Sequence, residues 1–516
     1  MKQLSLRART FDVTAGVNVV VLNEEEAREN DIFTYDRVVL KLGDKHTIAL
    51  VDLSPTLVRP GEIGLFLEVA EQLKVRRDDV LAVTPAEHPS AIEFIKKKMD
   101  GGVLSRQEID TVINELMENR LSEVELASFI TSLYIRGLNT DESVALTEAI
   151  VNSGETLDLR VHPIADKHST GGVAGNRTTM LIVPIVAAAG VYIPKTSSRS
   201  ITSAAGTADT MEVLANVSFS IDEMRRIVLK TKGCIAWGGA MNLAAADDKL
   251  IRIRHPLRLD PKGVMVASVL AKKKSVGAEY VVIDIPVGRG AKIESMERAN
   301  ELAREFVTIA GKLGMRTEVF ITYGRDPVGE GIGPALECRD VLRALQFKGP
   351  RDLTEKSCRL AGALLELAGR VEPGRGYAVA MDMLKNGKAY EKMKEIIEAQ
   401  GGNPNVRPDD LPIGQYRHEV RAEDDARVHL VDNHNINRLA RAAGAPKSKG
   451  AGVLLHVESG DRVKKGDLLF EVIAESESKL SFALDLLQKI EPIEFEKVIL
   501  GKMGEEKIFE WKPTGG

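Results

Sequence analysis

Cysteine is scarce in this sequence: its 516 residues include three, Cys234, Cys338 and Cys358. Three widely spaced cysteines are too few for a disulfide framework, and none has the CxxC spacing of a zinc site. Free cysteines are usually packed inside proteins. We therefore expect three ordinary buried thiols.

A basic excess and a long hydrophobic run are also missing. The formal net charge is −5, with 28% of the residues charged, which argues against a protein that binds nucleic-acid polymers. The longest apolar stretch, residues 180–191, is too short to span a bilayer, and no apolar signal segment follows the N-terminal basic residues. We expect a cytoplasmic protein without membrane partners. A small anionic ligand is compatible with this net charge, because its binding needs only a local cluster of donors.

The chain is long enough for several domains, and its patterns differ along its length. Short apolar runs broken by Gly and Asp predict a β-rich barrel or sandwich over residues 1–84. Capping-box sequences then begin at Ser105, Ser122 and Asn139, each with a Glu three residues later. They predict a helical domain over residues 85–160, which part of residues 240–275 is expected to complete.

Apolar strands and helices alternate from residue 161 onward. A strand at 280–285, a helix at 296–313 and a strand at 317–322 form the pattern of a βαβ unit with parallel strands. We therefore expect an α/β multidomain fold. It contains a parallel-sheet α/β domain at 161–345, a helical connection at 346–410 and a C-terminal α+β domain at 411–516.

The strongest chemical signal is the segment KHSTGGVAGNRTT at residues 167–179, which precedes an apolar helical run. Glycines let the backbone approach an anion, lysine and hydroxyl side chains donate to it, and the next helix adds its N-terminal N–H groups. The GKS or GKT ending of a Walker A loop is missing, which disfavours nucleoside triphosphate hydrolysis. The segment predicts a phosphate site with Lys167 and Ser169 as contacts. A purely structural turn is the alternative.

A second polar cluster, KTSSRSITSAAGTAD, occupies residues 195–209 and contains seven hydroxyl residues and two cations. Such groups are costly to bury unpaired, so they line either a solvated loop or a polar ligand. The chain order places both clusters after neighbouring strands of one expected sheet, where α/β proteins bind ligands. This placement favours the ligand-binding interpretation.

Together, the two clusters resemble the thymidine and pyrimidine-nucleoside phosphorylase family. The signature residues of that family match Ser197, Arg199, Gly206, Thr207, Asp209 and Glu212. The resemblance covers roughly residues 85–474. The additional first 84 residues, with several local departures, resemble the archaeal branch of the family, the AMP phosphorylases.

The resemblance implies a set of substrate contacts and a proton donor. The implied AMP contacts are Gly172, Ser198, Arg199, Ser200, Ile201, Thr202, Ser203, Thr207, Ser268 and Lys292. Asp260 matches the residue that protonates the departing base. A positioned acid fits the chemistry, because phosphorolysis builds negative charge on the leaving base. A turn cap before Pro261 is the structural alternative for this aspartate.

The residues at the expected base site differ from those of the pyrimidine-nucleoside enzymes, which hold the base with an Arg, a Ser and a Lys. The Ser and Lys positions match Ser268 and Lys272, but the Arg position falls on Ile253, which puts a pyrimidine-specific site in doubt. Three nearby arginines could substitute after a small shift: Arg252, Arg254 and Arg258. The phosphate loop is also one residue longer than that of the family, so its shape is expected to differ.

Two weaker candidates are polar side chains outside these matches. His168 could contact the base or orient the phosphate, although a histidine in a loop is more often structural. The adjacent Asp247 and Asp248 could hold a divalent cation, but neighbouring carboxylates on a helix point in different directions. We expect them to be solvated or salt-bridged, and we expect no metal site.

The resemblance implies phosphorolysis of AMP, and we expect CMP and UMP to react as well, giving free base and ribose 1,5-bisphosphate in nucleotide catabolism. Phosphate is a substrate, and no cofactor is expected. The alternatives are a pyrimidine nucleoside phosphorylase, a phosphoribosyltransferase, which residues 206–209 also resemble, and a non-catalytic nucleotide sensor. A homodimer or larger homo-oligomer is expected to assemble through the N- and C-terminal domains.

Overall fold

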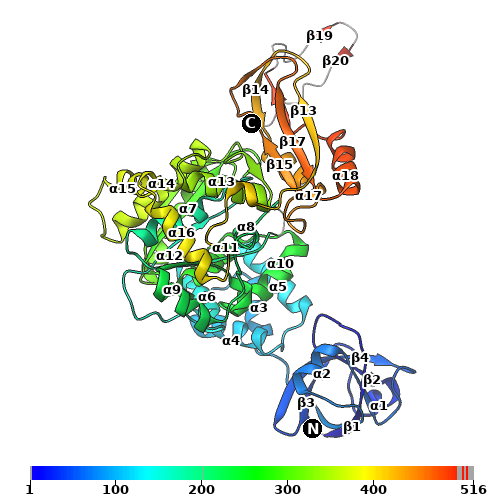
Figure 1. The fold of residues 1–516 in the computed structure, drawn as a ribbon. Helices are drawn as coiled ribbons and strands as arrows, with labels where there is room; N and C mark the ends of the chain where they lie inside the picture. Colours follow the sequence, from blue (N-terminus) through cyan, green and yellow to red (C-terminus); the bar gives the residue numbers. More distant parts are fainter. Residues whose placement is uncertain (1–2, 201–202, 497–502, 505–506, 509–516) are drawn as a thin grey trace. The chain divides into compact units, whose positions relative to one another are not determined.

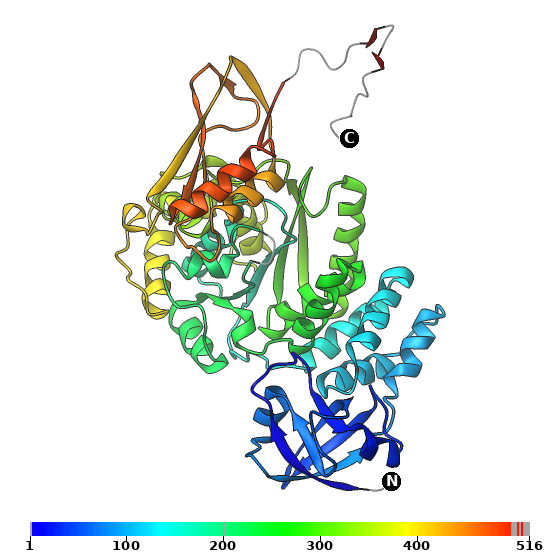
Figure 2. The same cartoon turned by 90° about the vertical axis from the view of Figure 1, so that its right-hand side faces the viewer.

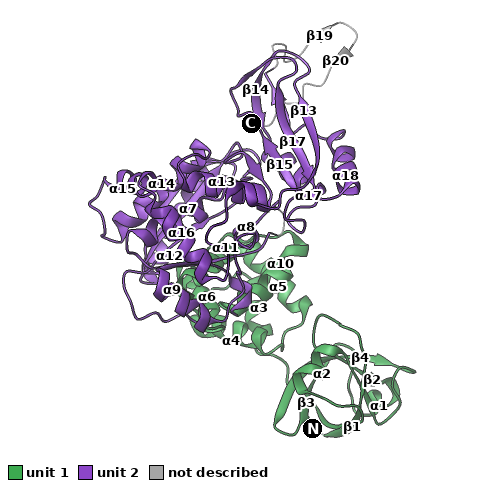
Figure 3. Ribbon diagram, in the orientation of Figure 1, with its two compact units in different colours: residues 1–155, 242–275 green, residues 156–241, 276–516 purple. Residues whose placement is uncertain are grey.

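Figure 1 shows the fold of the chain as a computed structural model, which describes residues 3–200, 203–496, 503–504 and 507–508. The chain divides into two compact units (Figure 3). The first comprises Met1–Glu155 and Asn242–Ser275, and the second comprises Thr156–Met241 and Val276–Gly516. Each unit is therefore built from two separate stretches of the chain.

The first unit begins with a closed barrel, drawn in blue in Figures 1 and 2, whose strand order is β1-β5-β2-β4-β3-β6. Two of its pairs, β1 with β5 and β2 with β4, are parallel. Alternating apolar residues such as Leu6, Val38 and Ile63 are buried in its core. The barrel consists of β1 (Leu4–Thr10), β2 (Val19–Asn23), α1 (Glu24–Glu29), β3 (Arg37–Leu42), β4 (Lys45–Ser54), β5 (Glu62–Leu65), α2 (Leu67–Leu73) and β6 (Val80–Pro85).

A helical bundle completes the first unit. All three predicted capping boxes are present, at Ser105, Ser122 and Asn139, and they start the second, third and fourth helices of the bundle. In each box the cap side chain accepts the N–H of the following Glu, and that carboxylate accepts the N–H of the cap residue. The helices are α3 (Ala91–Met99), α4 (Arg106–Met117), α5 (Glu123–Arg136), α6 (Thr140–Asn152), α10 (Ala245–Leu257) and α11 (Lys262–Ser275).

The second unit is centred on parallel strands. The predicted βαβ unit is present as β10 (Tyr280–Val287), α12 (Met296–Lys312) and β11 (Arg316–Tyr323), and β7 (Ala165–Ser169) pairs with the other edge of β10. A separate parallel pair joins β8 (Ile193–Ser197) to β9 (Gly233–Trp237). The connecting helices are α7 (Thr178–Ala188), α8 (Thr207–Met211) and α9 (Ile221–Thr231), with a 3-10 turn at η1 (Gly238–Ala240).

The two polar loops do not follow strands of one sheet, so that prediction is wrong. The strands β7 and β8 start beside each other, with a parallel bridge between Ile164 and Tyr192. Beyond this bridge β7 pairs with β10, whereas β8 pairs with β9. The strands therefore diverge into two sheets, although their loops remain connected by side chains.

The rest of the second unit contains helices and a C-terminal group of strands. Four strands pair in the order β12-β15-β17-β13, and three in the order β16-β14-β18. The helices are α13 (Pro334–Leu345), α14 (Arg351–Leu367), α15 (Gly376–Lys385), α16 (Lys388–Ala399), η2 (Pro408–Asp410), α17 (Asn433–Ala442) and α18 (Glu477–Leu487). The strands are β12 (Gly331–Ile332), β13 (Tyr416–Arg421), β14 (Ala426–Val431), β15 (Gly452–Leu455), β16 (Arg462–Val463), β17 (Leu468–Ala474), β18 (Ile493–Phe495), β19 (Met503–Gly504) and β20 (Lys507–Ile508).

The predicted α/β multidomain class, with helical, parallel-sheet and terminal β-containing parts, is confirmed. The three cysteines are free and buried, as expected. In the part of the chain that the structure describes, no helix combines the length and hydrophobicity needed to cross a membrane.

Candidate functional site

The predicted phosphate loop connects the end of β7 to the start of α7. Gly171 and Gly172 both have positive φ, +88° and +92°, which side chains rarely adopt. A Cβ atom on Gly172 would lie 2.2 Å from the backbone nitrogen of Lys292. Glycine at this position therefore allows the loop to touch the segment that carries Lys292, and the structure brings two of the predicted contacts together.

A buried carboxylate, Asp284 of β10, organises the polar residues next to this loop. Ser169 and Thr322 donate hydrogen bonds to it, at 2.9 and 2.6 Å. The Nζ atoms of Lys356 and Lys167 lie 3.2 and 3.9 Å from its Oδ2. Lys167 is 1% exposed and also donates to the Thr178 hydroxyl at the start of α7, so it lies beneath the loop.

The balance of charge in this cluster is positive. Burial alone would raise the pKa of the Asp284 carboxyl, but Lys167 and Lys356, with the hydroxyls of Thr322 and Ser169, hold the pKa below its usual range. Counted over these three side chains alone, one carboxylate between two lysines leaves a formal excess of one positive charge. Because the cluster is largely buried, solvent screens this charge weakly.

Lys356 was not predicted as a site residue. Its Nζ is buried and has no hydrogen-bond partner among the described residues, although it is within ion-pair distance of Asp284. The sequence signal was poor, because Lys356 lies in α14, far along the chain from the phosphate loop. Asp284 had a stronger signal, since it is the one charged residue in the buried strand YVVIDIPV.

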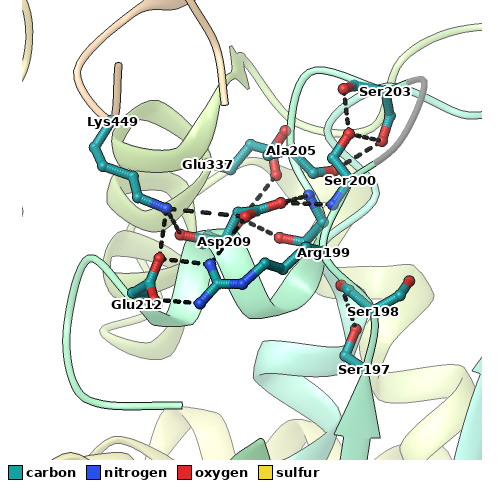
Figure 4. A network of polar contacts seen from close by, with 12 residues as sticks. Ser197, Ser198, Arg199, Ser200, Ser203, Ala205, Asp209, Glu212, Glu337 and Lys449 are labelled. Atoms are coloured by element: carbon teal, nitrogen blue, oxygen red, sulfur yellow. Dashed lines mark hydrogen bonds and ion pairs between the residues drawn. The ribbon is translucent and has the colours of Figure 1, made fainter. Parts of the chain in front are cut away.

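The second polar loop is folded by ion pairs between its own signature residues (Figure 4). The guanidinium of Arg199 makes two contacts with Glu212, at 2.5 and 2.7 Å, and Asp209 accepts the N–H groups of Ser200 and Gly206. Lys449 adds a second cation to Glu212 at 2.8 Å. These contacts give Arg199, Asp209 and Glu212 a loop-shaping role.

Gly206 allows the two limbs of this loop to close on each other. A Cβ atom there would lie 2.7 Å from the carbonyl oxygen of Ser198 and 2.8 Å from the amide nitrogen of Ser200. Any side chain would therefore push the limbs apart. The hydroxyl of Ser203 bonds back to the carbonyl of Ala205 at 3.0 Å within the same loop.

Arg177, at the end of the phosphate loop, connects the two loops. Its guanidinium donates to the Thr207 hydroxyl at 3.1 Å and to the Ala205 carbonyl at 2.9 Å, and it forms a close ion pair with Glu337. Burial raises the pKa of the Glu337 carboxyl, and Arg177 opposes that rise. Thr207, a predicted contact, is thus attached to the phosphate loop by a buried side chain.

The predicted base contacts lie in the first unit and share one carboxylate. Ser268 donates to Asp247 Oδ2 at 2.8 Å, and the Nζ of Lys272 lies 2.6 Å from the same oxygen. Asp247 is fully buried, whereas Asp248 is exposed, so the two aspartates point in different directions, as predicted. Ile253 lies in the bundle core.

Asp260, the predicted proton donor, precedes α11 and is paired with Arg254. Its side chain is 36% exposed. Of the other two arginines considered for the base, Arg252 donates to the Gly16 carbonyl at 3.2 Å, and Arg258 caps α10 in a left-handed conformation.

The remaining predicted residues differ in how far they are exposed. His168 is half-buried at the end of β7, opposite Ile283 of β10, and Ser198 and Lys292 are exposed. Ile201 and Thr202 lie outside the described residues.

Three family models match successive parts of the chain. Residues 92–154 match the helical bundle domain of the glycosyl transferase family, residues 161–390 match its a/b domain, and residues 427–494 match the pyrimidine nucleoside phosphorylase C-terminal domain. The structure of anthranilate phosphoribosyltransferase from Thermus thermophilus superimposes with a TM-score of 0.52 at 22% identity, covering 60% of this chain and 99% of that one. The fold and site thus define a glycosyltransferase of the nucleoside phosphorylase type.

Curated relatives narrow this class. The chain is 47% identical to the AMP phosphorylase of Thermococcus kodakarensis, over 97% of this chain and 100% of the relative. It is 44% identical to the AMP phosphorylase of Pyrococcus furiosus and 45% identical to that of Methanosarcina acetivorans, over 96% and 97% of this chain and 98% and 99% of those relatives. The chain belongs to the AMP phosphorylase family.

The ion pairs of the second loop predict a pH-dependent contribution to stability. The hydrogen bond from Arg199, with help from Lys449, lowers the pKa of the Glu212 carboxyl to about 2, against the opposing effect of burial. A lowered pKa stabilises the fold above the unfolded value of 4.5, and this contribution disappears as the pH falls toward 2. Glu212→Gln should therefore destabilise the protein by about 1 to 2 kcal/mol at pH 7, after allowance for solvent screening, and by much less near pH 3.

Unfolding midpoints measured between pH 3 and 7 test this expectation. The exposed Glu372→Gln variant is the matched control and should follow the wild type. A Glu212→Gln deficit that stays constant across this pH range would contradict the ion-pair assignment.

Proposed function

We propose that this chain cleaves AMP with inorganic phosphate, releasing adenine and ribose 1,5-bisphosphate, and that CMP and UMP also react. The observation that carries the proposal is the joining of two polar loops by Arg177, next to a buried cluster with excess positive charge. Such a site suits two phosphate-bearing reactants. The match to AMP phosphorylases over nearly the whole chain supports the same reaction.

Two loops would hold phosphate and nucleotide. Lys167, Ser169 and Gly172, with the hydroxyl of Thr207, would bind the attacking phosphate, and the charge of Lys356 would assist. The loop at residues 198–203 and Lys292 would bind the nucleotide. The close approach of Gly172 to Lys292 supports this assignment, because the backbone of Lys292 lies against the phosphate loop.

Three further residues would act on the base. Ser268 and Lys272 would contact it, and Asp260 would protonate it as the glycosidic bond breaks. In this step an oxygen of phosphate bonds to C1′ of the ribose, the C1′–N bond breaks with its electron pair going to the base, and the proton of Asp260 neutralises that base. His168 is a further candidate for orienting the phosphate.

Two features support the wider substrate range and self-association. By the resemblance, Ile253 matches the position of the base-binding Arg of the pyrimidine enzymes, and its apolar side chain lies in the bundle core. On the barrel, the aromatic side chains of Phe33 and Tyr35 are 62% and 73% exposed, which suits a contact between protomers through the N-terminal domain. The C-terminal domain is the second contact that we propose.

The first prediction from this proposal concerns phosphate. Adenine release from AMP should require inorganic phosphate, and Lys356→Met should raise the KM for phosphate on the order of 10-fold, because a weakly screened cation is lost. Lys356→Arg should retain most of the affinity. Steady-state kinetics at varied phosphate measure both effects, with the exposed Lys348→Met as control. Phosphate-independent release would contradict phosphorolysis, and an unchanged KM would remove Lys356 from the site.

The second prediction concerns the proton donor. Asp260→Asn keeps a hydrogen-bonding partner for Arg254 but removes the acid, so kcat for AMP should fall about 100-fold or more while AMP binding persists. A nucleotide with a better leaving base should lose less. The exposed Asp158→Asn is the control, and single-turnover rates give the measurement. Equal rates for wild type and variant would make Asp260 a structural cap.

The third prediction separates nucleotides from nucleosides. Lys292→Ala should lower kcat/KM for AMP about 10- to 100-fold, because a charge-assisted contact with the 5′-phosphate is lost. Residual cleavage of adenosine or uridine should change little, since nucleosides lack that phosphate. Equal losses for both substrate classes would favour the nucleoside phosphorylase alternative. Activity that requires magnesium and a ribosyl diphosphate would instead favour a phosphoribosyltransferase.

A further inference from the structure

Helix α17 of the C-terminal part carries three polar residues at four-residue spacing: Asn433, Asn437 and Arg441. Residues four apart lie on the same face of a helix. Other residues of this helix, including Ile436 and Leu439, are buried in the C-terminal core. The helix therefore has an anchored apolar side and a separate polar row.

The first residue of the row contacts the phosphate loop. The N–H of Ala174 donates to Asn433 Oδ1 at 3.0 Å, and the Asn433 amide donates to the carbonyls of Gly324 and Arg325 at 3.1 and 2.9 Å. Asn433 is completely buried, so these bonds are not exchanged readily for water. One side chain thus joins the phosphate loop to the segment that follows β11.

The next two residues of the row contact the second polar loop. The N–H of Ala204 donates to Asn437 Oδ1 at 3.0 Å, and the Arg441 guanidinium donates to the Ser203 carbonyl at 3.0 Å. The carbonyl of Ala205, the residue after Ala204, accepts a hydrogen bond from Arg177 of the phosphate loop. Contacts from two directions therefore fix the backbone around residues 203–205.

These bonds satisfy backbone groups that regular secondary structure does not pair. Ala174 and Ala204 are 2% and 0% exposed, and both lie in loops after strand ends. A buried N–H without an acceptor destabilises the conformation that contains it. Both loop conformations therefore depend on side-chain oxygens supplied by α17.

We propose that α17 is a positioning element. Its Asn433 holds the conformation of the phosphate loop, and its Asn437 holds that of the second polar loop, which binds the nucleotide in the proposed function. The C-terminal domain thereby affects substrate binding in addition to any role in assembly. This inference rests on the proposed function for the identity of the two ligands. The expected effects are specific to each loop: Asn433 governs phosphate affinity, and Asn437 governs nucleotide affinity.

Kinetics of matched asparagine variants test the inference. Asn437→Ala should raise the KM for AMP about 3- to 10-fold, the effect of one hydrogen bond, with little change in the KM for phosphate. Asn437→Asp keeps an oxygen acceptor for Ala204 and should restore most of the affinity. Asn435→Ala is the matched control, since its side chain donates to the Glu491 carbonyl at 3.1 Å within the C-terminal domain. Asn433→Ala should show the opposite pattern, with the larger change in the KM for phosphate.

Hydrogen exchange supplies a readout that does not require turnover. The amide of Ala204 should exchange faster in Asn437→Ala than in the wild type or in Asn435→Ala, whatever the substrate proves to be. Faster exchange without AMP cleavage by any form would leave α17 as a positioning element and overturn the proposed function instead. Unchanged exchange, or equal KM values for Asn437→Ala and Asn435→Ala, would overturn the inference even if both variants lower the unfolding temperature.

Discussion

The candidate phosphate site depends on the ion pairs and hydrogen bonds that stabilise the buried carboxylate of Asp284. A carboxylate is stable inside a protein only if cations and hydrogen-bond donors compensate for its lost hydration. Asp284 receives donors from β7 and β11, the two neighbours of its own strand, and cations from β7 and α14. The need to compensate one charge therefore fixes the strand ends from which the phosphate loop departs.

The three clusters of charged side chains differ in their balance of positive and negative charge. The cluster around Asp284 has one carboxylate for two lysines, whereas the second loop balances Arg199 and Lys449 against Asp209 and Glu212. The pair of Arg177 with Glu337 is balanced as well. Of these three clusters, the first has a formal excess of positive charge when its three charged side chains alone are counted. The balanced pairs hold the loops in shape, and under the proposed function the hydroxyl and backbone groups of the loops would contact the ligand.

Local sequence patterns predicted the features that depend on near neighbours. The capping boxes at Ser105, Ser122 and Asn139 and the βαβ unit followed from spacing alone, and the glycines of the phosphate loop pointed to an anion. Contacts between distant segments carried no such signal. The bond from Ala174 to Asn433 joins residues 259 positions apart, and Asn433 stands in an ordinary amphipathic helix. The divergence of β7 from β8 was missed for the same reason, since pairing partners of parallel strands are set by packing.

The residues proposed to contact the base have a different electrostatic environment from those of the phosphate loop. A nucleobase is neutral before it departs, so a bare cation would not discriminate it from other polar groups. Asp247 neutralises Lys272 and accepts the Ser268 hydroxyl through the same oxygen, so these side chains present oriented hydrogen-bonding groups without net charge. Ile253, at the position that the resemblance assigns to the base-binding Arg, lies in the bundle core. Under the proposed function, an uncharged contact would accept several bases, whereas positive charge beside the phosphate loop would favour anions. This contrast is consistent with the proposed substrates, in which the base varies and the phosphate is constant.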